Sequence, residues 1–434
     1  MPRLVHVIGA GLAGLAAAVQ LQRRGARVVL HEAAVQAGGR CRSYYDEALG
    51  AIIDNGNHIV LSGNHATLNY ARVIGSSDEL EGPHRPEFAF VDLAARMRWT
   101  AQFSSGWLAR WIFNAEAARV PGARPLDFLR LVPLLLAKPG RTVAQTLRCD
   151  GAFWTRLVEP LLFAMLNAEP RDATAQLAGA LVRETFAAGG DACRPLVARD
   201  GLASAFVDPA LRLLQHGGAV IRLGSRLQSM AFDERPPTAS GMAAARVSTL
   251  NFGDEVISLG QTDAAVLAVP PDAARGLVPG IQTPQRSSAV VSAHFAVEPP
   301  FGTPAATSLL NGTAQWMVAS DGRLSATVYA ADRLLAMPRE ALARAIWADV
   351  AQAASLPVEP LPAWQIVTEA NATFAARPEE ETRRPGTRTR WNNLMLAGDW
   401  TATGLPPTIE GAIRSGQKAA DLLLDVPIAP MERR

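Results

Sequence analysis

Three glycines near the start of the chain, Gly9, Gly11 and Gly14, have the G-x-G-x-x-G spacing of a turn that binds the phosphates of a dinucleotide. Because these positions lack side chains, the backbone can turn tightly, admit a pyrophosphate and pack a helix closely on a sheet. Leu12 and Ala13 begin the predicted helix, whose free N–H groups attract an anion. The sequence therefore predicts a dinucleotide-binding site to which all five residues contribute.

An acidic residue follows the glycines at the distance that a ribose-binding group requires. The apolar residues 4–8 predict a strand before the turn, and residues 27–31 predict a second strand after the helix. Glu32 ends this second strand, about 20 residues after the glycines, where a carboxylate hydrogen-bonds a ribose diol and disfavours a 2′-phosphate. A glycine turn that serves packing alone is the alternative, but it does not account for the acid.

The motif continues with Gly38, Gly39 and Arg40, which predict a second anion-facing loop. By itself Arg40 would be interpreted as a solvated surface arginine, and the two glycines favour a cofactor contact instead. With Arg42 and Ser43, the segment resembles the G-G-R-x-x-S continuation of FAD enzymes in the monoamine oxidase and phytoene desaturase superfamily. The resemblance implies that the dinucleotide is FAD.

A second glycine turn, near the carboxyl terminus, is typical of the other end of a flavin site. The turn and the start of the helix after it, predicted from about residue 409 to 424, supply five predicted cofactor contacts: Gly398, Asp399, Thr408, Ile409 and Glu410. An acid in the turn can bind the ribityl chain or a water, and helix N–H groups suit the negative charge at N1 and O2 of reduced flavin. This segment contains no cysteine, so we expect FAD to be bound noncovalently.

The nucleotide-binding pattern is interrupted twice, which is typical of a discontinuous domain. A predicted helix, 201–216, and a predicted strand, 220–223, lead to Arg226 and Leu227, which we expect beside the adenine. The polar residues 376–390 predict an exposed loop. The predicted fold class is α/β, with a Rossmann-like FAD-binding domain and an inserted α+β substrate domain, as in monoamine oxidase and phytoene desaturase. The FAD-binding domain comprises residues 1–79, 201–274 and 386–434, and the substrate domain comprises 80–200 and 275–385.

The segment Asp54-Asn55-Gly56-Asn57-His58 carries a closer family resemblance. Together with the segments 61–64, 398–400 and 405–408, it resembles the squalene-associated FAD-dependent desaturases, the hydroxysqualene dehydroxylases of bacterial hopanoid synthesis. The resemblance implies that bound, reduced FAD removes the allylic hydroxyl of hydroxysqualene to give squalene and water. It also implies that this loop runs beside the isoalloxazine, so Asn55, Gly56, Asn57 and His58 are predicted cofactor contacts.

His58 is the predicted general acid, because loss of hydroxide from an allylic carbon needs a proton donor and histidine can be protonated near neutral pH. Asn57 is the second candidate catalytic residue. The alternative for both is a hydrogen bond to the cofactor or the backbone. The flavin would transfer the hydride, and the protein would supply an apolar pocket that excludes water.

Two other functions agree with these motifs. A carotenoid desaturase of the phytoene type shares the cofactor motifs and an apolar substrate, and a flavin-binding protein without turnover could serve as an assembly partner of terpenoid enzymes. An amine oxidase is disfavoured, since that resemblance implies a lysine beside flavin N5 and a tyrosine where this chain has Thr408. The only lysines, Lys138 and Lys418, are not convincing counterparts.

Composition favours a globular enzyme. The chain has 434 residues, 49% of them hydrophobic, and a formal charge of +2, which disfavours disorder and a nucleic-acid partner. Its three cysteines lack C-x-x-C spacing and its histidines lack ligand spacing, so neither a disulfide framework nor a metal site is predicted. We expect a cytoplasmic protein, because no targeting segment and no apolar run long enough to span a bilayer is present.

Residues 101–156 combine basic and apolar side chains in a way typical of a membrane contact. Eight basic and three acidic residues give a local charge of +5, and Trp107, Trp111 and the leucines of 131–136 lie among them. Such a segment suits an anionic membrane surface, here the inner face of the cell membrane, while a buried helix pair with solvated charges is an equal alternative. The expected partners are an apolar isoprenoid substrate, an anionic membrane and an electron donor that the sequence does not specify.

Overall fold

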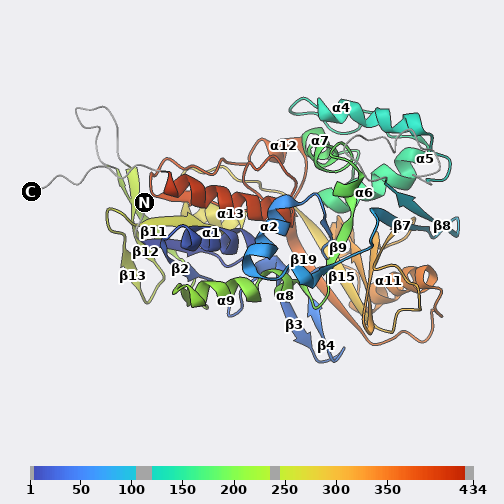
Figure 1. Cartoon of the computed structure of the whole chain (residues 1–434), viewed down its shortest axis with the longest axis horizontal. Coiled ribbons are helices and arrows are strands. Elements are labelled where there is room, and N and C mark those ends of the chain that lie inside the picture. Colours follow the sequence, from blue (N-terminus) through green and yellow to red (C-terminus); the bar gives the residue numbers. More distant parts are fainter. Residues whose placement is uncertain (1–3, 104–119, 235–244, 426–434) are drawn as a thin grey trace, which may run out of the picture.

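The computed structural model describes residues 4–103, 120–234 and 245–425, which form two main sheets with their helices (Figure 1). The first sheet is parallel, with the strand order β10-β2-β1-β14-β20. Its strands are β1 (Leu4–Ile8), β2 (Arg27–His31), β10 (Val220–Arg222), β14 (Ala264–Leu267) and β20 (Leu394–Leu396). Segments that are far apart in the sequence therefore bring their strands together in one sheet.

The alternation of residues along these strands decides what each face of the sheet contacts. Val5 and Val7 of β1 pack in one apolar cluster with α1 (Leu12–Arg23), α9 (Asp208–His216) and α13 (Ile409–Leu424). Ile8 belongs instead to a cluster shared with a small antiparallel sheet made of β11 (Ser229–Glu234), β12 (Ala245–Asn251) and β13 (Val256–Ser258). Helices α1 and α13 lie side by side in Figure 1, and a Cβ at Gly416 would be only 2.0 Å from the carbonyl oxygen of Ala13. The glycine therefore permits the close packing of these two helices.

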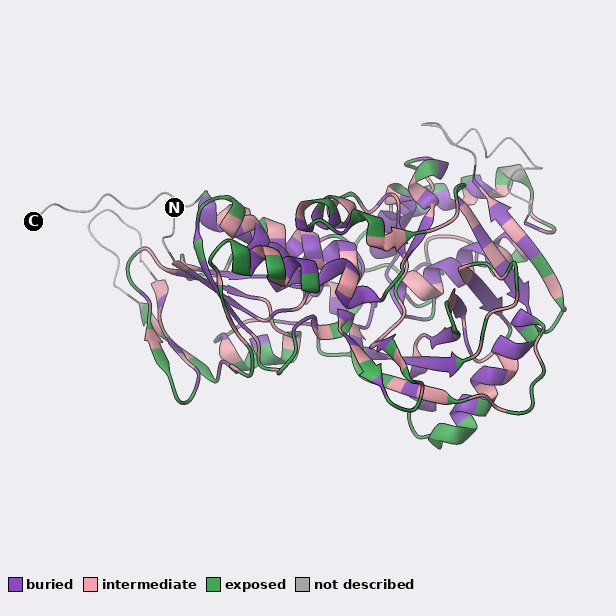
Figure 2. Cartoon of the chain, turned by 60° about the horizontal axis from the view of Figure 1, so that its bottom comes forward, coloured by how far each residue is buried: buried purple, intermediate pink, exposed green. Residues whose placement is uncertain are grey.

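The second main sheet has seven strands in the order β19-β15-β18-β17-β16-β7-β8, and only the β16–β7 pair is parallel. Its strands are β7 (Glu87–Asp92), β8 (Met97–Gln102), β15 (Ser287–Ala296), β16 (Ala306–Leu310), β17 (Trp316–Ser320), β18 (Arg323–Val328) and β19 (Trp364–Phe374). One face is covered by α11 (Arg339–Ala354), whose Leu342, Ile346 and Val350 recur at helical spacing and pack on the strands. Figure 2 shows the buried residues along the strands of both main sheets.

Shorter elements connect and cover the sheets. A run of consecutive helices follows β8 in the chain. It comprises η4 (Pro125–Leu131), α4 (Val132–Leu135), α5 (Gly151–Phe153), the π-helix η5 (Trp154–Val158), α6 (Glu159–Leu166) and α7 (Ala175–Glu184). The short strands are β3 (Ser43–Asp46), β4 (Ala51–Asp54), β5 (Val60–Leu61), β6 (Leu80–Glu81) and β9 (Pro195–Ala198). The remaining helices are η1 (Gly39–Cys41), α2 (His65–Ile74), η2 (Ser77–Glu79), η6 (Gly190–Cys193), α8 (Leu202–Phe206), α10 (Pro271–Leu277), η7 (Ala331–Leu334) and α12 (Pro378–Glu381). Over the described ranges, no helix is long and apolar enough to cross a membrane.

Two expectations from the sequence are wrong. The single helix expected over 201–216 is two helices, α8 and α9, because Pro209 near the start of α9 cannot donate a backbone hydrogen bond into the preceding turn. Residues 376–390 are not simply an exposed loop, since they include α12 and two buried charged side chains, Glu380 and Arg384, which are 1% and 6% exposed. Contacts with the rest of the chain, described below, explain the burial of Arg384.

Candidate functional site

The three glycines of the N-terminal turn have different roles in the folded chain. Gly9 has a φ of +103°, and a Cβ there would lie 2.4 Å from the oxygen of Ala268, while a Cβ at Gly14 would lie 1.8 Å from the oxygen of Gly9. Packing of the protein itself therefore requires these two glycines. At Gly11 a Cβ would meet no atom within 4 Å, so the protein leaves open the space beside this residue. An open space at the N-terminus of α1 fits the pyrophosphate of FAD.

The first residues of α1 and the predicted ribose ligand lie beside this turn. The side chains of Leu12 and Ala13 are buried in the helix–sheet core, and their backbone N–H groups belong to the first turn of α1, whose N–H groups have no acceptor within the helix. Glu32 accepts hydrogen bonds from the N–H groups of Ala10 (2.7 Å) and Ala34 (2.9 Å), so its carboxylate is fixed at the end of β2 next to the turn. Each of its oxygens has a further lone pair, which suits the predicted ribose contact.

The predicted adenine segment meets the same end of β2. The N–H of Ser225 donates to the backbone carbonyl oxygen of Glu32 at 2.7 Å. The two residues after Ser225 are the predicted adenine contacts. Arg226 is exposed, and Leu227 is buried in the apolar cluster between the parallel sheet and the small antiparallel sheet. The structure thus brings Glu32, Arg226 and Leu227 together, although they come from distant parts of the sequence.

An ion pair joins the N-terminal motif to the C-terminal motif. Gly38 and Gly39 have φ values of +108° and +56°, and the turn that they form directs Arg40 toward Asp399. The guanidinium of Arg40 donates two hydrogen bonds to the Asp399 carboxylate, at 2.7 and 2.8 Å, and another to the oxygen of Ala372. The negative charge of Asp399 raises the pKa of Arg40. Two residues predicted as separate cofactor contacts therefore form one unit across 359 positions of sequence.

Arg384, which the sequence did not indicate as a site residue, holds the backbone of Asp399 in the Arg40–Asp399 pair. Its guanidinium donates to the backbone oxygen of Asp399 at 3.0 Å and to the hydroxyl of Thr403 at 2.8 Å, and it lies 4.8 Å from the ring centroid of Phe374. At the same turn, Gly398 donates its N–H to Ser415 at 2.7 Å, and a Cβ there would lie 2.4 Å from Nε1 of Trp400. The only signal in the sequence was an arginine within a polar segment, which is also what a solvated loop contains.

The start of α13 offers free donors, but the carboxylate beside them has another task. Thr408 is the N-cap of α13 and accepts from the N–H of Gly411 at 3.1 Å. In the part of the chain that the structure describes, no protein acceptor meets the N–H groups of Ile409 and Glu410, which suits an anionic group. The Glu410 carboxylate is 2% exposed and accepts from the N–H of Thr67 at 2.8 Å and of Ala66 at 3.1 Å. It therefore caps α2, and the predicted cofactor contact of Glu410 is left to its backbone.

The loop after β4 connects the N-terminal motif with the seven-stranded sheet. Asn55 donates its N–H to the oxygen of Arg42 at 3.0 Å, and Nδ2 of Asn57 donates to Oγ1 of Thr327 in β18 at 3.1 Å. A Cβ at Gly56 would lie 3.7 Å from Nε2 of His58, so these two residues are neighbours. The loop is thus tied to the N-terminal motif at one end and to the seven-stranded sheet at the other.

His58 is not poised as an acid in the cofactor-free protein. His58 is an exposed residue of the structure, and desolvation by the surrounding protein together with the positive charge of Arg40 lowers the pKa of His58 to about 4. The neutral imidazole therefore predominates at neutral pH. The catalytic roles of His58 and Asn57 remain predictions, and their positions agree equally with hydrogen bonds to the cofactor.

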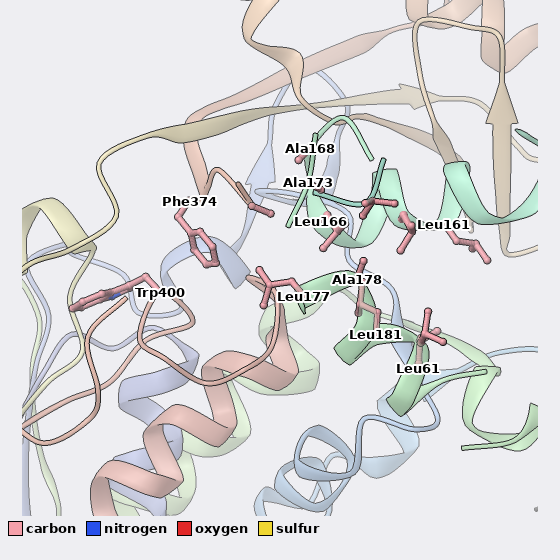
Figure 3. Packing of buried hydrophobic residues seen from close by; sticks show 14 of the residues in the cluster. Leu61, Leu161, Leu166, Ala168, Ala173, Leu177, Ala178, Leu181, Phe374 and Trp400 are labelled. Carbon is pink, nitrogen blue, oxygen red and sulfur yellow. The ribbon is translucent and has the colours of Figure 1, made fainter. Parts of the chain in front are cut away.

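Apolar side chains from distant elements meet beside the polar network. Figure 3 shows Phe374 of β19, Trp400 and Leu177 of α7 in one buried cluster with residues of α6. Trp400 directly follows Asp399 in the sequence, so the apolar cluster adjoins the Arg40–Asp399 pair. Within the described residues there is no group of three or more potential metal-binding side chains. The arrangement suits an organic cofactor next to apolar surface.

This combination of a dinucleotide turn, a closing helix and a separate mixed sheet defines a class of flavoenzymes. A family model described as flavin containing amine oxidoreductase matches residues 12–424. The structure of cyclohexylamine oxidase from Brevibacterium oxydans has the same fold, with a TM-score of 0.68 over 98% of this chain and 99% of that chain, at 18% identity. The chain belongs to the flavin-containing amine oxidoreductase family and is an FAD-dependent oxidoreductase.

Relatives of nearly the same length are more similar in sequence. The chain is 50% identical over 424 residues to hydroxysqualene dehydroxylase of Sinorhizobium fredii, covering 98% of this chain and 99% of the relative. It is also 50% identical over 425 residues to hydroxysqualene dehydroxylase of Rhodopseudomonas palustris, with the same coverage. The family resemblance drawn from residues 54–58, 61–64, 398–400 and 405–408 is confirmed.

Proposed function

We propose that this enzyme removes the hydroxyl of hydroxysqualene to give squalene and water, working in the reductive direction. The observation that carries the proposal is the 50% identity, over almost the whole chain, to proteins named for that dehydroxylation. Reduced FAD supplies the hydride that replaces the hydroxyl on carbon, and a proton converts the departing hydroxide to water. Two electrons and two protons thus pass from FADH2 to hydroxysqualene, which balances the reaction.

The chain's own residues would hold the cofactor at its two ends. The open space at Gly11 would receive the pyrophosphate, Glu32 the ribose, and the free N–H groups of Ile409 and Glu410 an anionic part of the cofactor. The Arg40–Asp399 pair would fix the distance between the N-terminal glycine motifs and the C-terminal turn. The parallel sheet and its helices would form the FAD-binding domain, and the seven-stranded sheet with α6 and α7 would form the substrate domain.

The apolar side chains packed around Phe374 and Trp400, which are 5% and 3% exposed, form a dry wall beside the polar network. A wall of this kind would keep out water, which would otherwise compete with the hydride for an allylic cation.

An anaerobic experiment tests the reaction. Chemically reduced enzyme mixed with hydroxysqualene should regain the absorbance of oxidised flavin and yield an equal amount of squalene. If hydroxysqualene leaves the reduced flavin unchanged while phytoene bleaches the oxidised enzyme, a carotenoid desaturase is the correct assignment. If neither compound alters the flavin, the non-catalytic assembly partner is favoured. The electron donor that reduces FAD in the cell can then be sought by its ability to sustain turnover.

We also propose that the segment around α4 lies on an anionic membrane, which would place this enzyme of the cytoplasm at the inner face of the cell membrane. One face of the helical segment 125–136 is buried, through Phe128, Leu131 and Leu134. The opposite face is apolar too, yet exposed, with Leu126 at 66%, Leu129 at 50%, Val132 at 45% and Leu136 at 79%. A buried helix pair accounts for the first face but not for the second.

Exposed basic side chains flank this segment in the sequence. Arg124 precedes it, and Lys138 and Arg141 follow it, which suits the negative surface of an anionic bilayer. Trp107 and Trp111, the tryptophans of the sequence prediction, lie outside the described residues. The apolar face and the basic residues that flank it in the sequence together fit a membrane into which leucines insert.

Vesicle binding tests this contact. Leu129→Glu combined with Leu136→Glu should weaken binding to phosphatidylglycerol vesicles at least about tenfold, because two charges replace inserted leucines. Phe301→Glu is the matched control, since Phe301 is fully exposed far along the sequence and should leave binding unchanged. Equal binding of the double variant and the wild type would refute the proposal. The proposal would also be refuted if the wild type bound phosphatidylcholine vesicles as tightly as phosphatidylglycerol vesicles, or if its binding to phosphatidylglycerol were the same at high and low salt.

A further inference from the structure

A buried hydroxyl group without a partner lies beside the loop of residues 54–58. Ser292, on β15, is 1% exposed, and among the described residues its Oγ has no hydrogen-bond partner. A buried polar group without a partner is unfavourable and calls for an explanation, of which a bound molecule or water is one. The position of Ser292 therefore needs an explanation that the fold by itself does not supply.

Ser292 is one end of a polar row that crosses three strands. It lies directly opposite Thr327 on β18, and Thr327 lies directly opposite Trp316 on β17, so all three face the same side of the sheet. Nε1 of Trp316 is likewise buried and unpartnered within the described ranges. Thr327 accepts the hydrogen bond from Asn57, which leaves its own O–H free to donate. Three donors are thus aligned on one face.

This face is the one that meets the predicted cofactor loop. A Cβ at Gly56 would lie 3.8 Å from Oγ of Ser292 and 3.7 Å from Nε2 of His58, so both groups border the same point. The opposite face of the sheet packs on α11 through residues such as Met317 and Ile346. Ser292 and Thr327 therefore point toward the 54–58 loop and away from the α11 core.

We propose that Ser292 and Thr327 bind the oxygen of the substrate's hydroxyl group and donate hydrogen bonds to it as it leaves. This inference rests on the proposed function, because it names the residues that distinguish hydroxysqualene from squalene. Neutral hydroxyls can fill this role at neutral pH, whereas His58, whose pKa is lowered, is mostly uncharged there. As the carbon–oxygen bond breaks, negative charge grows on oxygen and the two donated hydrogen bonds strengthen. Trp316 would border the same site and keep it closed to water.

Binding to the oxidised enzyme tests the inference without turnover. The FAD-loaded, oxidised protein in detergent is titrated with tritiated hydroxysqualene and, separately, with tritiated squalene in equilibrium dialysis. The wild type should bind hydroxysqualene more tightly than squalene. Ser292→Ala and Thr327→Val should each weaken hydroxysqualene binding about tenfold and leave squalene binding unchanged, because only the alcohol loses a hydrogen bond. Ser292→Ala should keep or raise the Tm, since the removed hydroxyl has no partner in the protein.

Thr307 on β16 provides the matched control. Its hydroxyl is also buried and unpartnered in the described structure, but Thr307 is paired with Met317 and so faces α11. Thr307→Val should leave both affinities unchanged. The inference is overturned if the wild type does not discriminate between the two compounds, if Ser292→Ala keeps the discrimination, or if Thr307→Val abolishes it equally. Oxidation of the reduced enzyme by hydroxysqualene, measured separately, decides the proposed function whatever the outcome here.

Discussion

Replacing Gly11 with alanine should strongly weaken FAD binding and leave the protein folded. Gly11 is the N-cap of α1, with φ −74° and ψ 175°, and alanine adopts these angles without strain. Because a Cβ at this position would meet no protein atom within 4 Å, the added methyl displaces nothing in the cofactor-free chain. It would occupy the space that the pyrophosphate is expected to fill.

Two small effects on stability nearly cancel. Alanine is a poorer N-cap than glycine by about 0.5–1 kcal/mol, while it lowers the entropy of the unfolded chain and so stabilises the fold by about 0.4–1 kcal/mol. The free energy of unfolding of the cofactor-free protein should therefore change by less than about 0.5 kcal/mol. A methyl group in contact with the pyrophosphate should weaken FAD binding at least about 100-fold, which corresponds to roughly 2.7 kcal/mol.

The assay compares the two quantities in the same preparations. Cofactor-free wild type and Gly11→Ala are unfolded in urea, and FAD is titrated against each while flavin fluorescence is followed. Gly14→Ala is the matched control, because its Cβ would lie 1.8 Å from the oxygen of Gly9 and should destabilise the cofactor-free protein as well. If Gly11→Ala binds FAD as tightly as the wild type, the pyrophosphate does not lie at this turn. If Gly11→Ala unfolds like Gly14→Ala, the glycine serves packing alone.

Three further outcomes are expected. Glu410→Gln should lower the free energy of unfolding by about 1–3 kcal/mol in urea, since the buried carboxylate that caps α2 is lost; a loss of FAD affinity at unchanged stability would instead assign the carboxylate to the cofactor. The protein should lose stability in mild acid, because burial lowers the pKa of His31 and of His294 to about 3 from the ordinary 6.5. The neutral rings therefore stabilise the fold above pH 6.5. Below that value each histidine lowers the free energy of unfolding by about 1.4 kcal/mol per pH unit. His294→Asn should flatten the dependence of urea unfolding on pH between 6.5 and 4.5, and an unchanged slope would contradict this. Acid precipitation should release FAD into solution, because the C-terminal turn has no cysteine for a covalent link; yellow colour retained on the precipitate would refute noncovalent binding.

The elements that frame the candidate cofactor site were predictable because they are encoded by local sequence. The strands expected at residues 4–8 and 27–31 are β1 and β2, and the helix expected from about 409 to 424 is α13. Such elements follow from the spacing of apolar residues and glycines within a few turns of chain, and their order along the chain specifies an α/β dinucleotide site. The same local patterns supported the family resemblance that the comparisons confirm.

The pairing of side chains across the molecule could not be predicted in this way. A lone arginine in a polar segment is compatible with solvent, so nothing local indicated that Arg384 would be buried behind Asp399. The role of Glu410 as a cap of α2, and of Ser292 as an unpartnered donor, also depends on elements hundreds of residues away. By itself the sequence determined the cofactor and the family, because phosphate-binding turns are made of neighbouring residues. Only the tertiary structure decided which charges are paired, which hydroxyls remain free and which apolar face is exposed, because these depend on what the fold places opposite each side chain.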